Sequence, residues 1–237
     1  MDLRTGYREL RPPDALRGLV ACFWVRVTEA AGDIHIVPDA CTDLIWQQGE
    51  GTIVAGPDTA PRVIGRAAGD VVIGMRVLPG AGGGVLGVPL DGLRDLRVEM
   101  ADVDRAFDAD GDLAPQEVVS RFVSAALGRQ ADPLVALASR RVVRQEVDAI
   151  ARDLGISERQ LRRRFHAAAG YGPKTLARIL RFRRFVDAID RGRSDLAAVA
   201  LDVGYADQSH LTRETTRLAG LPPAAFMRAR STQPPPV

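Results

Sequence analysis

Two copies of one pattern lie between Val147 and Phe226, and they constrain the fold more than any other feature of the sequence. The copies are IARDLGISERQLRRRF (150–165) and VALDVGYADQSHLTRET (199–215). In each copy a small Ala is followed four positions later by Gly, and a Leu then lies in a second helix. Gly suits the left-handed backbone that ends the first helix, and Ala lets the two helices approach closely. The pattern predicts two helix-turn-helix units, a motif whose second helix enters the major groove of DNA.

The repeat extends beyond the motif itself. Gly170 and Pro173 after the first copy recur as Gly220 and Pro223 after the second. A single helix-turn-helix pattern is a weak signal, but two in tandem with matching flanks are strong evidence for a duplicated unit.

These residues resemble a known family. The stretch GYADQSHLTR (204–213), in the second of two units joined by a long helix, is similar to the AraC/XylS family of bacterial transcription regulators. The resemblance covers about the last hundred residues, and it implies a regulator that binds double-stranded DNA. The chain departs from the family at Thr215, where members usually carry Phe, so the second unit is expected to lose an aromatic residue from its core.

Charge is distributed unevenly along the chain. The whole chain has 32 Lys/Arg and 30 Asp/Glu, but residues 139–230 hold 19 basic and 10 acidic residues, a net charge of +9. The other positions hold 13 basic and 20 acidic residues, a net charge of −7. A basic C-terminal part behind an acidic N-terminal part fits a DNA-binding domain with a separate partner domain.

The first hundred residues contain short β-branched and aromatic runs broken by Gly and Pro. Such spacing favours an antiparallel barrel or sandwich. The sequence therefore predicts an α+β chain of two domains, with a barrel-like β-rich sensor at 1–100 and tandem helix-turn-helix units at 132–230. Residues 101–131 are expected to form a solvated acidic linker and an amphipathic helix, and 231–237 a disordered tail.

Two segments between these domains and one within the first domain allow alternatives. The helix expected at 115–127 either mediates dimerisation or covers the sensor core. The Gly-rich stretch 79–84 lacks the Gly-Lys-Ser/Thr ending of a phosphate-binding loop and is interpreted as a tight turn between strands. The aspartates at 102–112 lack the closing Glu of a calcium loop.

The predicted reading helices have outward-facing polar residues. Leu161 and Phe165 point inward in the first helix, and Leu211 points inward in the second. The remaining faces give the candidate DNA-binding residues: Arg159, Arg162 and Arg163 in the first unit, and Gln208, Ser209, Thr212 and Arg213 in the second. Arg suits guanine in the major groove, whereas Arg164 and Arg178 are interpreted as phosphate contacts.

A small-molecule effector in the N-terminal domain is the preferred sensor hypothesis. The candidate ligand-binding residues are Trp24, Asp39, Asp43, Trp46 and Arg76, with the tryptophans as aromatic walls. Asp43 and Arg76 have an equal alternative as a structural ion pair. The stretch 35–46 is similar to an uncharacterised domain often found in front of such regulators, and that likeness carries no function beyond a sensor.

Two other classes of sensor remain open. One is control by a protein partner through a docking or dimerisation domain, and the other is a metal or redox site made from Cys22, His35 and Cys41. RNA polymerase and a second copy of the chain are further candidate partners. We expect no cofactor, no bound metal, no catalytic site and no membrane span, and a cytoplasmic location for a chain with two cysteines.

Overall fold

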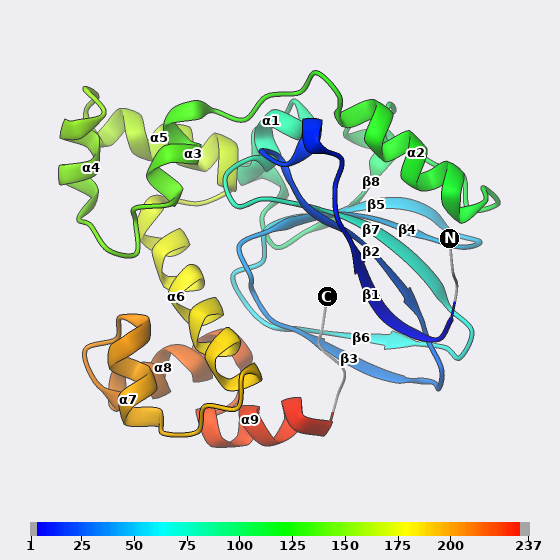
Figure 1. The fold of residues 1–237 in the computed structure, drawn as a ribbon. Helices are drawn as coiled ribbons and strands as arrows, with labels where there is room; N and C mark the ends of the chain where they lie inside the picture. Colours follow the sequence, from blue (N-terminus) through cyan, green and yellow to red (C-terminus); the bar gives the residue numbers. More distant parts are fainter. Residues whose placement is uncertain (1–3, 233–237) are drawn as a thin grey trace.

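The computed structural model describes residues 4–232, which form a β-rich N-terminal part and a helical C-terminal part (Figure 1). The strands are β1 (Gly6–Leu10), β2 (Val20–Val27), β3 (Gly32–Ile36), β4 (Thr42–Gln47), β5 (Gly51–Ala55), β6 (Arg62–Arg66), β7 (Val71–Val77) and β8 (Arg97–Glu99). The predicted α+β class with two domains is confirmed.

Six of the described strands form an antiparallel sheet in the order β1-β2-β7-β4-β5-β8, and β3 pairs with β6 in a separate ribbon. Because side chains alternate along a strand, each central strand sends one set to each face. Phe23, Leu44 and Met75 pack into a core on one face. Trp24, Ile45 and Val72 point to the other face, which the β3–β6 ribbon covers (Figure 1).

The strands of residues 4–232 do not close into a barrel. β1 and β8 are the edges of the large sheet, and β3 and β6 pair only with each other. The barrel-like shape expected from strand spacing is therefore replaced by an open sheet and a ribbon facing each other, because spacing alone does not determine which strands pair.

The segment after β8 is packed against the sheet, contrary to the expectation of a solvated acidic linker. It begins with the 3-10 helix η3 (Met100–Asp102), and Phe107 and Ala109 beyond it are buried. Trp46 Nε1 donates to the Asp110 carbonyl at 2.8 Å. The aspartates remain near the surface while the apolar residues between them fill the core. The number of acidic residues alone therefore did not indicate that this segment is packed.

Helix α2 (Pro115–Ala126) lies along the same face of the sheet (Figure 1). Its Val118, Phe122 and Ala126 are fully buried in the core of the N-terminal part. The apolar stripe is thus used within the chain, as in the interpretation of a helix that covers the sensor core.

The C-terminal part consists of seven described helices around one core. They are α3 (Pro133–Ser139), α4 (Val147–Asp153), α5 (Glu158–Ala169), α6 (Pro173–Asp190), α7 (Leu196–Val203), α8 (Gln208–Ala219) and α9 (Pro223–Thr232). Asp132 caps α3, because its side chain accepts hydrogen bonds from the amides of Leu134 and Val135. The predicted long helix is α6, which separates the α4–α5 unit from the α7–α8 unit (Figure 1).

The Gly-rich stretch ends in a short helix, α1 (Gly82–Leu86), rather than in a turn between strands. α1 and the 3-10 helix η2 (Leu90–Leu93) contact α5, so the first helix-turn-helix unit is docked on the N-terminal part. A Cβ on Gly83 would lie 2.3 Å from the Ala167 carbonyl oxygen. Glycine is needed here because the two backbones approach closely, not because a phosphate is bound.

None of the helices in residues 4–232 is long and apolar enough to cross a membrane. The tail predicted at 231–237 falls mostly outside the described residues, which end at 232.

Candidate DNA interface and ligand cavity

The first unit folds as its sequence pattern predicts. Gly155 adopts a left-handed φ of 68°, and Ala151 is buried where α4 meets α5. The Ser157 hydroxyl caps α5 by accepting from the Gln160 amide at 3.2 Å, and the Gln160 side chain accepts from the Ser157 amide at 2.9 Å. This reciprocal capping box satisfies orphan donors at the start of the candidate reading helix.

The three predicted arginines of α5 are all exposed but have different surroundings. Arg159 has no ion-pair partner among the described residues, whereas Arg162 pairs with Glu158 one turn earlier. Arg163 lines an open cleft of about 820 Å³ between α5 and the N-terminal part, opposite Gly83 and Gly84.

Arg164 and Arg178, interpreted from the sequence as phosphate contacts, are engaged within the chain. Arg164 pairs with Asp132, the cap of α3, at 2.6 Å. Arg178 on α6 lies 3.5 Å from the Glu214 carboxylate on α8. Both residues link helices, which the sequence did not indicate because their acidic partners are 32 and 36 positions away.

The second unit repeats the geometry of the first. Gly204 has a φ of 96°, and Asp207 caps α8 by accepting from the His210 amide at 2.6 Å. Tyr205 is buried in the corner between α7 and α8, where it contacts the His210 ring edge-on at a centroid distance of 5.1 Å. The left-handed turn predicted at Gly204 is confirmed.

The predicted polar residues of α8 share its outward side. Gln208, Ser209 and Arg213 are exposed, and Thr212 is half-buried. The Thr212 hydroxyl donates to the Gln208 carbonyl at 2.9 Å, which leaves its methyl group as the free part of the side chain. Arg213 has no ion-pair partner in residues 4–232, so its guanidinium is available to an acceptor.

The departure at Thr215 has a visible consequence. Thr215 is fully buried in α8, and its hydroxyl has no hydrogen-bond partner among the described residues. The Tyr205 hydroxyl in the same unit is likewise buried without a hydrogen bond. The second unit thus buries polar atoms where an aromatic ring would fill the space with apolar contacts.

A cavity lies between the large sheet and the β3–β6 ribbon. Its apolar walls include Trp24 and Ile45 from the sheet and Ile34 and Ile64 from the ribbon. The cavity measures about 50 Å³, which holds only a few water molecules. A larger molecule would enter only if the ribbon moved away from the sheet.

Trp24, Asp39 and Asp43 all line this cavity, as the sequence suggested for a ligand site. Arg76 lies behind them and holds both carboxylates. Its Nε is 3.1 Å from Asp43 and 3.5 Å from Asp39, and its Nη2 donates to Asp43 at 3.2 Å. Burial alone would lower the pKa of Arg76, but the two carboxylates raise it overall. The alternative of an ion pair between Asp43 and Arg76 is therefore present in the structure.

Trp46 is not part of the cavity, contrary to its prediction as an aromatic wall beside Trp24. It lies three positions after Asp43 on β4, so its side chain points to the opposite face of the sheet. There it is fully buried in the core against the segment around Asp110. The alternation of β4 was visible in the sequence and could have excluded Trp46.

The residues of the metal or redox hypothesis are not brought together. Cys22 and Cys41 are buried free thiols, and His35 is exposed on β3. Within the described part of the chain, no three His, Cys, Asp or Glu residues cluster as a metal site would require. Burial raises the pKa of Cys22 to about 12, which keeps this thiol protonated and unreactive at neutral pH.

The sequence did not indicate that the loop 37–41 contacts both parts of the chain. Val37, Asp39 and Cys41 line the sheet cavity, while Ala40 packs into the core of the helical part. Arg183 on α6 approaches the Cys41 sulfur at 3.7 Å. Ala40 adopts a left-handed φ of 71°, which is rare for a residue with a Cβ and gave no signal in the sequence.

Comparison with known proteins identifies both parts of the chain. Residues 150–229 match the family described as Helix-turn-helix domain, and residues 8–99 match the family described as Domain of unknown function (DUF6597). No curated protein matches the chain significantly.

The chain is similar to solved structures of ToxT from Vibrio cholerae. One at 1.65 Å resolution has a TM-score of 0.47 and 8% sequence identity, covering 84% of this chain and 97% of ToxT. A complex of ToxT with (E)-4-(8-methylnaphthalen-1-yl)but-3-enoic acid has a TM-score of 0.48 and 10% identity, covering 87% and 98% of the two chains.

The buried hydroxyl of Thr215 leads to a stability prediction. Thr215→Val keeps the shape of the side chain and removes an unpaired buried polar group, so the free energy of unfolding should rise by about 1 kcal/mol. Urea denaturation measures this change. Thr216→Val is the matched control, because Thr216 is exposed and its hydroxyl already donates to the Thr212 carbonyl. A loss of stability in Thr215→Val would show that the hydroxyl stabilises the fold.

Proposed function

Because the chain carries an AraC-type helix-turn-helix domain behind a DUF6597 domain, we propose that it is a sequence-specific DNA-binding transcription regulator. The observation that carries the proposal is the presence of two capped, outward-facing reading helices, α5 and α8, at the two ends of one connecting helix. The net charge of +9 in residues 139–230 favours approach to a polyanion.

In this proposal α5 reads one major groove through Arg159, Arg162 and Arg163. α8 reads the next major groove through Gln208, Ser209, Thr212 and Arg213. The 18 residues of α6 at about 1.5 Å each span roughly 27 Å, and helix widths at each end bring the reading helices near the 34 Å of one duplex turn. One chain therefore reads an asymmetric site without a second copy.

The two units should contribute unequally to specificity. Arg163 projects from a helix whose Leu161 and Phe165 are fully buried, whereas Arg213 projects from the helix that buries Thr215. Arg163→Ala should weaken binding by about 1–3 kcal/mol and relax the preference at one base pair. Arg213→Ala should cost less, because a less tightly packed helix holds its side chains less firmly in the groove.

The measurement uses a duplex selected from a random library by the full-length chain, together with its single-base variants, at one salt concentration. Arg217→Ala is the control, since Arg217 is exposed in the last turn of α8, away from its N-terminal reading residues. A larger loss for Arg213→Ala would reverse the ranking, and equal losses on every duplex variant would mean that neither arginine reads a base.

For the N-terminal domain we propose the role of an effector sensor, with the ligand between the large sheet and the β3–β6 ribbon. Trp24, Asp39 and Asp43 would contact the ligand, and Arg76 would hold the two carboxylates in place. The apolar lining with a few fixed polar groups supports this assignment. The small volume implies that the ligand opens the ribbon as it enters.

A thermal-shift screen of a small-molecule library tests the sensor role, because a ligand that binds the folded state raises the melting temperature. Ile64→Trp should fill the cavity and abolish the shift produced by a hit. Val63→Trp is the matched control, since the neighbouring Val63 side chain is 56% exposed on the outer side of β6. A library without hits, or a shift that survives Ile64→Trp, would contradict a ligand site here and favour control by a protein partner.

A further inference from the structure

Three arginines gather beside the middle of α6 without any acidic partner. Arg181 and Arg184 are three positions apart and share one side of α6. Arg144 comes from the connection between α3 and α4. None of the three forms an ion pair with a carboxylate within residues 4–232, and Arg181 Nε has no hydrogen-bond acceptor there. We call Arg144, Arg181 and Arg184 the waist cluster.

The electrostatic surroundings of the waist cluster differ from those of Arg178, Arg193 and Arg230 on or beside α6, each of which has an acidic partner. Burial lowers the pKa of Arg184, and the guanidinium groups of Arg144 and Arg181 lower it further. The three like charges repel one another, and no carboxylate of residues 4–232 is among the groups that shift the pKa of Arg184. An anion placed among them would remove this cost.

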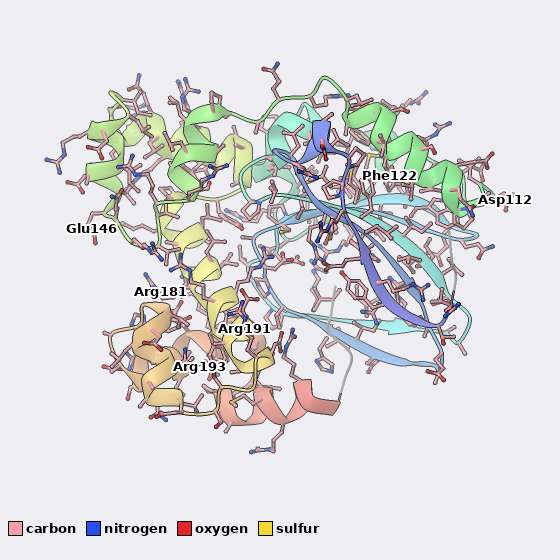
Figure 2. All side chains as sticks on the ribbon, in the orientation of Figure 1. Asp112, Phe122, Glu146, Arg181, Arg191 and Arg193 are labelled. Carbon is pink, nitrogen blue, oxygen red and sulfur yellow. The ribbon has the colours of Figure 1, made fainter. Side chains whose placement is uncertain are left out.

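The position of Arg181 identifies which side of α6 carries the cluster. Its guanidinium stacks over the Tyr205 ring at 5.5 Å from the centroid, directly beside the turn that begins α8. Figure 2 shows Arg181 between the α4–α5 unit and the α7–α8 unit. Arg183, by contrast, faces the loop 37–41 of the N-terminal part. The waist cluster is thus on a side of α6 that adjoins the second reading helix.

The geometry of the duplex determines what this side of α6 would meet. If α5 and α8 enter successive major grooves on one face of DNA, a minor groove lies between them. That groove is edged by the phosphates of both strands. Arg181 and Arg184 are near the midpoint of α6, and Arg181 adjoins the turn that begins α8, so in this placement the cluster would lie beside these phosphates.

We propose that the waist cluster binds the phosphodiester backbone of DNA across the minor groove that separates the two sites read by α5 and α8. This inference rests on the proposed DNA-binding function. The cluster would fix the register of both reading helices on the duplex without reading sequence, as phosphate contacts do. Arg supplies several donors to phosphate oxygens at once, which suits this role.

Salt dependence of binding to a random-sequence duplex of 30 base pairs tests the proposal, because phosphate contacts do not require the specific site. Each phosphate contact adds about 0.9 to the slope of log affinity against log salt. The full-length double variant Arg144→Gln/Arg184→Gln should therefore have a slope shallower by about 2. Its loss of affinity between 50 and 200 mM salt should be about 12-fold smaller than that of the unchanged chain. Arg181 is left intact, because its contact with Tyr205 also supports the packing of the second unit.

Two controls separate phosphate binding from a change in folding. Arg105→Gln removes the same charge from an exposed position in the N-terminal part and should leave the slope unchanged. Arg184→Lys keeps the charge and should retain the slope of the unchanged chain. Melting temperatures of the double variant should not fall, since removing like charges from a cluster relieves repulsion.

The outcomes distinguish this inference from the function on which it rests. If the unchanged chain bound no duplex at all, the proposed function would fail. If the unchanged chain bound with a steep salt slope and the double variant had the same slope, the waist cluster would not contact DNA. That result would point instead to an acidic protein segment as its partner and would overturn the proposal.

Discussion

The helical part depends on one constraint, the burial of both sides of α6 in a single core. Phe182 and Phe185 on α6 pack against Phe226 of α9, with ring centroids 5.8 and 6.4 Å apart. The same core reaches Leu161 in α5 and Leu211 in α8. Because all these residues exclude water together, α5 and α8 cannot move independently without exposing apolar surface. The two helix-turn-helix units therefore share one apolar core.

The N-terminal part contacts the helical part at two places, and the two contacts are of different kinds. At α1 the contact is close and steric, since Gly83 admits the backbone of α5. At the loop 37–41 the contact is mixed, with Ala40 in the helical core and Asp39 held by Arg76 beside the sheet cavity. A shift of the β3–β6 ribbon would displace this loop first, because the loop follows β3 directly. This gives a physical route from the cavity to α6.

The C-terminal fold was largely predictable from the sequence, whereas the N-terminal fold was predictable only in outline. Gly155 and Gly204 adopt the predicted left-handed backbone, and Ser157 and Asp132 follow the equally local rule of helix caps. Strand pairing and the packing of Phe107 depend on contacts between distant positions, which a single sequence does not encode locally. The same limit explains why the sequence alone does not reveal that Arg178 and Arg164 pair with Glu214 and Asp132.

We propose that one chain places α5 and α8 in successive major grooves, with α6 setting the distance between them. Hydroxyl-radical footprinting of the full-length chain on a selected duplex, at a measured ratio of chains to DNA, tests this placement. We expect two protected stretches about ten base pairs apart on one face of the duplex with one chain bound. A single protected stretch, or two stretches that require two chains on a palindrome, would contradict it.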